Sequence, residues 1–122
     1  MPIGNTKWII PDMFWPEHTA PGVCVSHEAI CILNLSDKDC DVSITLFFED
    51  MEPMVLQNTL CPSKRTRHIR MDKICGVNGV SVPRGIGYSA LVECSVPVVV
   101  QYTRVDATQA ANSIMTTLAY PS

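Results

Sequence analysis

The sequence contains no long apolar run and no excess of positive charge, and both absences exclude classes of protein. No window approaches the roughly 18 apolar residues that a membrane-spanning helix needs. The opening stretch, MPIGNTKWIIPDMFW, has neither a basic leader nor an apolar run of signal-peptide length. We therefore expect a soluble, cytoplasmic protein. The net charge of −3 gives no general attraction to nucleic acid or to anionic membranes.

Motifs that mark common enzymes and metal sites are also missing. There is no Walker loop, Gly-x-Gly-x-x-Gly, His-Glu-x-x-His or EF-hand pattern. The six cysteines contain no Cys-x-x-Cys pair, and the three histidines have no regular metal spacing. We therefore expect no enzymatic activity, no cofactor and no metal ion. Six cysteines are compatible with three disulfides, but a cytoplasmic location favours reduced thiols.

Helix signals are poor, and short β-prone segments separated by turn residues make up most of the chain. Residues 41–49 alternate apolar and polar side chains, which is typical of a half-buried antiparallel strand. Residues 74–87 are rich in glycine and predict a long loop, and only 106–112 look helical, for a turn or two. Further strands are expected at 8–10 (ended by Pro11), 28–33, 55–60, 66–71, 88–93, 96–105 and 113–119.

Seven or eight short strands with regular turn signals predict an all-β fold, a single-domain antiparallel β-sandwich over residues 1–122. A closed barrel is the structural alternative. The chain has no internal repeat, low-complexity tract or linker.

The tripeptide Ser26-His27-Glu28 contains the residue types of a catalytic triad. Neighbours in an extended chain point to opposite faces, so His27 cannot easily meet Ser26 or Glu28. The simpler interpretation is that these polar groups satisfy backbone groups where a strand begins.

Residues 64–73, KRTRHIRMDK, hold five of the nine lysines and arginines. One interpretation is a solvated charged edge that prevents aggregation; the other is a site for an anion or a partner. Nucleic-acid binding is less well supported, because no aromatic side chains are interleaved. On a strand, one face would carry Arg65, Arg67, Ile69 and Met71, and the other Thr66, His68, Arg70 and Asp72.

The stretch SVPVVVQYTRVDATQAAN, residues 95–112, begins apolar and turns polar without a break. We interpret it as a central strand that leaves the core at the rim of the sandwich, where binding residues often lie. Arg104 and Asp106 would share one face there, and Gln101 and Thr103 the opposite one. Two alternatives stay open: these side chains bind a ligand, or they lock a turn or a subunit interface.

Three segments together resemble the sensory rhodopsin transducer family: SHEAICILN from Ser26, KRTRHIRMD from Lys64, and VPVVVQYTRVDATQAANSIMTTLAY from Val96. The resemblance implies a small β-sandwich that assembles as a homo-oligomer, a tetramer. It also implies a choice of roles, either relaying a signal from a membrane photoreceptor or sensing a small polar ligand such as a sugar or sugar acid. The site residues that it implies are Ser26, His27, Glu28, Arg65, Thr66, His68, Arg70, Gln101, Thr103, Arg104, Asp106 and Gln109.

Two features depart from the family pattern. Tyr102 stands where histidine is common in the family, and we include it among the candidate ligand or partner contacts. The glycine-rich loop with Cys75 is the second departure, so the ligand cannot be transferred from the family. DNA binding as a transcriptional adaptor is a further alternative, and it predicts steep salt dependence through Arg65, Arg67 and Arg70.

Overall fold

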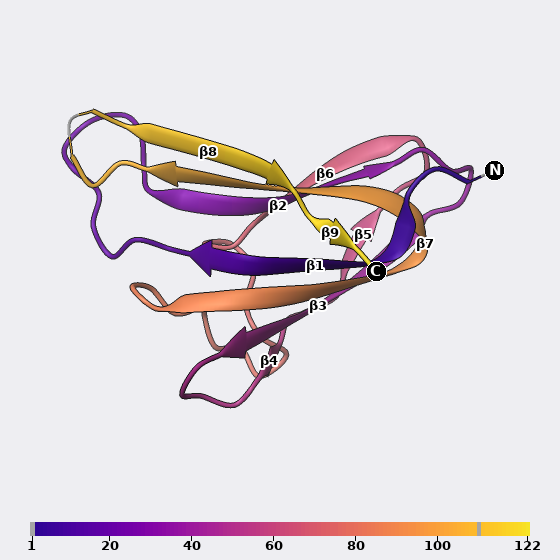
Figure 1. Ribbon diagram of the computed structural model, residues 1–122, viewed down its shortest axis with the longest axis horizontal. Helices are drawn as coiled ribbons and strands as arrows, with labels where there is room; N and C mark the ends of the chain where they lie inside the picture. Colours follow the sequence, from indigo (N-terminus) through magenta and orange to yellow (C-terminus); the bar gives the residue numbers. More distant parts are fainter. Residues whose placement is uncertain (1, 110) are drawn as a thin grey trace.

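The computed structural model describes residues 2–109 and 111–122, which form two antiparallel sheets and no helix (Figure 1). Within this described part, no helix is therefore long and apolar enough to cross a membrane. The predicted β-sandwich is confirmed, with nine strands rather than seven or eight. The strands are β1 (Asn5–Phe14), β2 (His27–Asn34), β3 (Cys40–Phe48), β4 (Met54–Val55), β5 (Thr59–Cys61), β6 (Arg65–Arg70), β7 (Gly87–Asp106), β8 (Ser113–Leu118) and β9 (Tyr120–Pro121).

Strand β7 connects the two sheets because it belongs to both. Its first half pairs with β1 and β3 in the first sheet, and its second half pairs with β2 and β8 in the second sheet. The prediction of two strands interrupted at Cys94-Ser95 was wrong, since β7 runs through them for 20 residues. Ser95 instead marks the bend between the sheets, where its exposed Oγ accepts a hydrogen bond from the Asp41 amide at 2.8 Å. Strand β7 curves from the first sheet into the second and keeps its strand conformation (Figure 1).

The order of strands places β2 and the second half of β7 at the centre of the second sheet. This sheet runs β6-β2-β7-β8, and the first runs β4-β3-β7-β1-β9, with β5 also paired to β3. Alternate residues of β2, β3 and β7 fill the space between the sheets, as their polar–apolar alternation predicts. All six cysteines are free, and burial raises the pKa of the Cys94 thiol to about 12.

Strand β1 continues past the proline that we expected to end it. Its pairing with β7 shifts between Ile10 and Met13, so Pro11 lies in an irregular step that needs no donor from its nitrogen. At its other end β1 lies close to β7: a Cβ on Gly4 would be 2.0 Å from the Val98 carbonyl oxygen. Glycine is the residue that permits this approach.

Two other expectations were partly wrong. The strand expected at 55–60 is divided into β4 and β5, because Leu56 makes only an isolated bridge to Gly76. The stretch 106–112 has no helical turn among its described residues; Ala110 lies outside them. The long loop at 74–87 is confirmed, and an isolated bridge joins Cys75 to Ser81 within it.

Candidate functional site

The residues expected at one rim lie on two opposite faces of the second sheet. Cross-strand partners share a face, and the register pairs Arg70 and Thr103 with Ala29, and His68 and Gln101 with Cys31. We call this outward-facing surface the polar face. It contains His27, Thr66, His68, Arg70, Gln101, Thr103 and Thr116. Glu28, Tyr102 and Arg104 lie on the opposite side, so a single ligand cannot contact both groups from one side of the sheet.

The inward group is a network of hydrogen bonds around the buried carboxylate of Glu28. The Tyr102 hydroxyl donates to Oε2 of Glu28, and the Phe14 amide donates to the same oxygen at 3.0 Å. The Nε group of Arg104 donates to the Tyr102 oxygen at 3.1 Å. At the rim, Nη2 of Arg104 lies 3.8 Å from Oδ1 of the exposed Asp12. The network joins β1, β2 and β7 inside the sandwich.

Burial dominates the electrostatics of this network. It raises the pKa of Glu28 above its ordinary value, although the Tyr102 and Phe14 hydrogen bonds and the Arg104 charge act in the opposite direction. The pKa of Tyr102 is also raised, first by burial and then by the Glu28 charge, so its hydroxyl stays a donor. Oε1 of Glu28 and Nη2 of Arg104 are buried and have no hydrogen-bond partner among the described residues.

The polar face presents ordered hydrogen-bonding groups where β7 pairs with β8. Nε2 of Gln101 donates to Oγ1 of Thr116 at 2.6 Å, and the Thr103 and Thr116 hydroxyls lie 3.1 Å apart. Thr116 also donates to the Tyr102 carbonyl at 3.1 Å. These contacts hold three neighbouring side chains in fixed positions on one surface, which is the preorganisation that a binding site needs.

A bidentate ion pair lies at the β6 end of the polar face, across β2 from Gln101 and Thr103. Nε and Nη2 of Arg70 donate to the two oxygens of Asp72 at 2.8 and 2.7 Å. These bonds hold the pKa of Asp72 below its ordinary range. The ion pair therefore holds the Arg70 guanidinium and the Asp72 carboxylate in a fixed relative orientation.

Ser26 lies apart from both groups, and His27 makes a separate contact at the start of β2. The Ser26 Oγ donates to the His18 carbonyl and accepts from the Ala107 amide, each at 2.9 Å, while Nδ1 of His27 lies 2.6 Å from the Val25 carbonyl oxygen. Ser26, His27 and Glu28 thus contact different groups, as the alternation of an extended chain predicts.

The side chains of Asp106 and Arg65 form hydrogen bonds with residues that are close to them in the chain. Oδ1 of Asp106 accepts two hydrogen bonds from Thr108, so it caps the end of β7 rather than pairing with Arg104. The Arg65 guanidinium donates to the neighbouring Lys64 carbonyl, and Gln109 is exposed beyond the end of β7.

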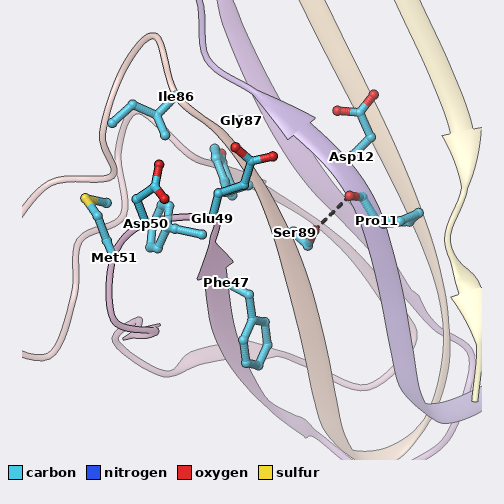
Figure 2. Close-up of a pocket in the computed structure, with 11 residues that line it drawn as sticks. Pro11, Asp12, Phe47, Glu49, Asp50, Met51, Ile86, Gly87 and Ser89 are labelled. Carbon is cyan, nitrogen blue, oxygen red and sulfur yellow. Dashed lines mark hydrogen bonds between the residues drawn. The ribbon is translucent and has the colours of Figure 1, made fainter.

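Two grooves lie on the surface, and neither was predicted as a unit. One, of about 310 Å³, lies beside β6 and includes Arg67 and Lys73 in its lining; we call it the basic groove. The other, the acidic groove, measures about 670 Å³ and combines the carboxyl groups of Asp12, Glu49 and Asp50 with the apolar side chains of Phe47, Met51 and Ile86. Figure 2 shows these side chains around the ends of β1, β3 and β7.

Three large aromatic side chains that could in principle stack against a sugar ring are not accessible. Trp8, Trp15 and Tyr102 are all buried. The Trp8 indole donates to the Asn5 and Val98 carbonyls, and the Arg84 guanidinium lies 4.2 Å from the centre of the Trp15 ring. These rings serve the core, and ligand contacts must come from polar groups.

The ligand or partner contacts that we listed from the sequence omit Asp72, Thr116, Arg67 and Lys73, although Arg67 was considered for DNA binding. Asp72 follows Arg70 by two positions, in the turn directly after β6, and this spacing was the available signal for the ion pair. Thr116 carries no such signal, because only the pairing of β7 with β8 brings it to Gln101.

Known proteins are similar to this one over nearly the whole chain. Residues 3–121 match the sequence model of the family described as "Anabaena sensory rhodopsin transducer". The structure entitled "Crystal Structure of Thermotoga maritima 1070" is similar with a TM-score of 0.87 and 34% identity, covering 98% of this chain and 97% of that one. The structure entitled "Anabaena sensory rhodopsin transducer" has a TM-score of 0.75 and 33% identity, covering 90% and 96%. No curated protein matches the chain.

Proposed function

The chain belongs to the Anabaena sensory rhodopsin transducer family, and on that premise we propose that it is a non-enzymatic, cytoplasmic binding and signalling module. Its ligand is a small polar molecule, such as a sugar or a sugar acid, bound on the polar face. The observation that carries this proposal is the fixed set of donors and acceptors formed by Gln101, Thr103 and Thr116 and by the Arg70–Asp72 pair.

The chemistry of the polar face suits hydroxyl groups. A carboxylate beside a guanidinium offers an acceptor and a donor to neighbouring hydroxyls, and threonine and glutamine side chains add both kinds of group. Without an aromatic ring to stack on, binding rests on hydrogen bonds that compete with water. We therefore expect weak binding, with a dissociation constant of roughly 0.1 to 1 mM.

Titration calorimetry against a panel of neutral sugars and uronic acids tests this proposal. A protein concentration of about 100 µM or more is needed to detect such weak binding. Thr103→Val removes a hydroxyl from the polar face while keeping its shape, and Thr45→Val is the matched control on the first sheet. If a sugar gives binding heat, and this heat is smaller for Thr103→Val but unchanged for Thr45→Val, the result supports the site. If no sugar gives any heat, the result contradicts the proposal.

A second candidate function, relay from a membrane receptor, is favoured by the acidic groove. Three carboxyl groups and exposed Phe47, Met51 and Ile86 line it, and no lysine or arginine does. This combination complements a basic, partly apolar peptide, and the cytoplasmic segments of membrane proteins are rich in lysine and arginine.

Binding of a labelled lysine–leucine peptide, followed by fluorescence anisotropy, tests the second candidate. The double variant Glu49→Gln/Asp50→Asn should weaken binding, whereas Asp37→Asn/Asp41→Asn, which removes the same charge elsewhere, should not. Equal binding by both variants would argue against the groove as the receptor contact.

We also propose that the chain forms a homo-oligomer, a tetramer, through β8. Among the described residues this strand pairs with β7 alone and its other edge is open, and all six of its residues are exposed. Ile114 is 73% and Leu118 68% exposed, on the face of β8 that also carries Thr116. Met115 is exposed on the opposite face of β8. An open apolar edge favours aggregation unless a partner covers it, and a second copy supplies an edge of identical chemistry.

A further inference from the structure

The basic groove lies at the free edge of the second sheet. Within residues 2–109 and 111–122, strand β6 pairs only with β2, and the groove runs along its other side, next to residues 57–59. The turn after β6 folds back over Arg70, whose carbonyl accepts from the amides of Lys73 and Ile74 at 3.1 and 3.2 Å. This turn brings Lys73 to the same groove as Arg67, although the two residues are six positions apart.

The lining of this groove consists mainly of hydrogen-bond donors. Arg67, Arg70, Lys73 and His68 supply cationic or imidazole nitrogens, and Gln57 and Asn58 supply amide groups. No aspartate or glutamate of the described residues lines it, in a chain whose net charge is −3. Asp72 occupies two donors of Arg70, whereas Arg67 and Lys73 make no salt bridge among the described residues. Two cationic side chains thus remain without a carboxylate partner.

We propose that the basic groove binds the oxyanion of a small metabolite, a carboxylate or a phosphate group, through Arg67 and Lys73. The inference rests on the proposed function and deepens it, because His68 and Arg70 belong to both the groove and the polar face. The charged group of the ligand occupies the groove, and its hydroxyls extend over β6 toward Arg70 and Thr103. The ligand is then an acidic or phosphorylated sugar rather than a neutral one.

The size of the groove favours a small anion over a nucleic acid. Its volume of about 310 Å³ is at the lower end of the range of small-molecule sites. A duplex-binding surface commonly makes about 6 to 10 phosphate contacts, whereas this groove offers two cations without a carboxylate partner. The acidic net charge would also repel the rest of a duplex.

Calorimetry at constant ionic strength, with four titrants, tests the inference on the full chain. The titrants are sodium phosphate, glucuronate, glucose and a short DNA duplex. We expect glucuronate or phosphate to bind and glucose to bind at least about ten-fold more weakly, because a charge-assisted bond is roughly twice as strong as a neutral one. Arg67→Gln and Lys73→Gln should each weaken anion binding by about ten-fold. Lys7→Gln, which removes one charge from an exposed position of β1, should leave it unchanged.

The outcomes separate this inference from the proposed function. Equal binding of glucose and glucuronate, unaffected by Arg67→Gln, overturns the anion site and leaves sugar binding intact. Phosphate binding that needs Arg67 and Lys73, without heat from either sugar, supports the groove and contradicts the sugar proposal. Stronger binding of DNA than of phosphate, lost in Arg67→Gln, overturns the choice of a small ligand. No heat from any titrant overturns both proposals, provided that circular dichroism shows folded protein.

Discussion

The Tyr102 hydroxyl donates a hydrogen bond to the buried carboxylate of Glu28, and this contact joins the two central strands of the second sheet. Arg104 and the Phe14 amide complete the arrangement from β7 and β1. The contact lies directly behind the polar face, because Thr103, between Tyr102 and Arg104, points to the other side of the sheet. We infer that it holds β2 and β7 in the register that pairs Thr103 with Ala29.

Tyr102→Phe removes the hydroxyl and keeps the ring. The Glu28 oxygen and the Arg104 Nε group each lose a partner in a buried setting, so we expect the free energy of unfolding to fall by about 1 to 3 kcal/mol. Urea denaturation followed by circular dichroism measures this change. Tyr120→Phe, at an exposed position of β9, should have little effect, and equal stability of the two variants would contradict a structural role for the network.

The free energy of unfolding should depend on pH because of Glu28. Burial raises its pKa in the folded protein above the unfolded value of about 4.5, so the folded state binds the proton more tightly. Its contribution to stability is complete below the unfolded pKa and is lost as the pH rises through the folded pKa. Glu28→Gln does not titrate, so its unfolding midpoint in urea should decline less than that of the wild type above about pH 4.5.

A series of urea midpoints from about pH 4 to about pH 8 measures that difference. Glu52→Gln, at an exposed position, is the control and should follow the wild-type curve. Parallel curves for the wild type and Glu28→Gln would show that the carboxyl group does not change its pKa on folding.

Ser26→Ala should loosen the loops at the rim. The Ser26 Oγ bridges the His18 carbonyl and the Ala107 amide, so the substitution leaves two backbone groups without this partner. We expect a loss of about 1 to 3 kcal/mol in unfolding free energy, and faster hydrogen exchange at the Ala107 amide. Ser113→Ala, at an exposed position of β8, is the matched control. Unchanged exchange at Ala107 would mean that the loop is held by other contacts.

Leu118→Lys should dissociate the oligomer that we propose. A lysine in place of an exposed leucine puts a charge into the apolar edge that a second copy would cover, and desolvating it opposes association. Light scattering after gel filtration should give four times 13.5 kDa for the wild type and a smaller mass for the variant. Val77→Lys, at an exposed position of the long loop, should keep the wild-type mass. A wild-type chain that elutes as a monomer would contradict the proposal.

The alternation of side chains in the sequence was enough to predict the sandwich and most of its strands. The pattern over 41–49 placed Val42, Ile44 and Leu46 inside, and these residues are buried in β3. Likewise, alternation placed Arg70 and His68 on one face of β6, because successive residues of a strand point to opposite sides. Such predictions depend only on the order of residues along one extended strand, so they do not require knowledge of which strands pair.

The tertiary structure was needed to show which strand faces pack together and which strands lie side by side. The pairing of β7 with both sheets turned two expected strands into one and divided the candidate residues between the polar face and the Glu28 network. It also brought Thr116 to Gln101, and the folded turn after β6 brought Lys73 to Arg67. The physical reason is that strand order and the bend of β7 are set by long-range packing of the two sheets, which local alternation and turn signals do not specify.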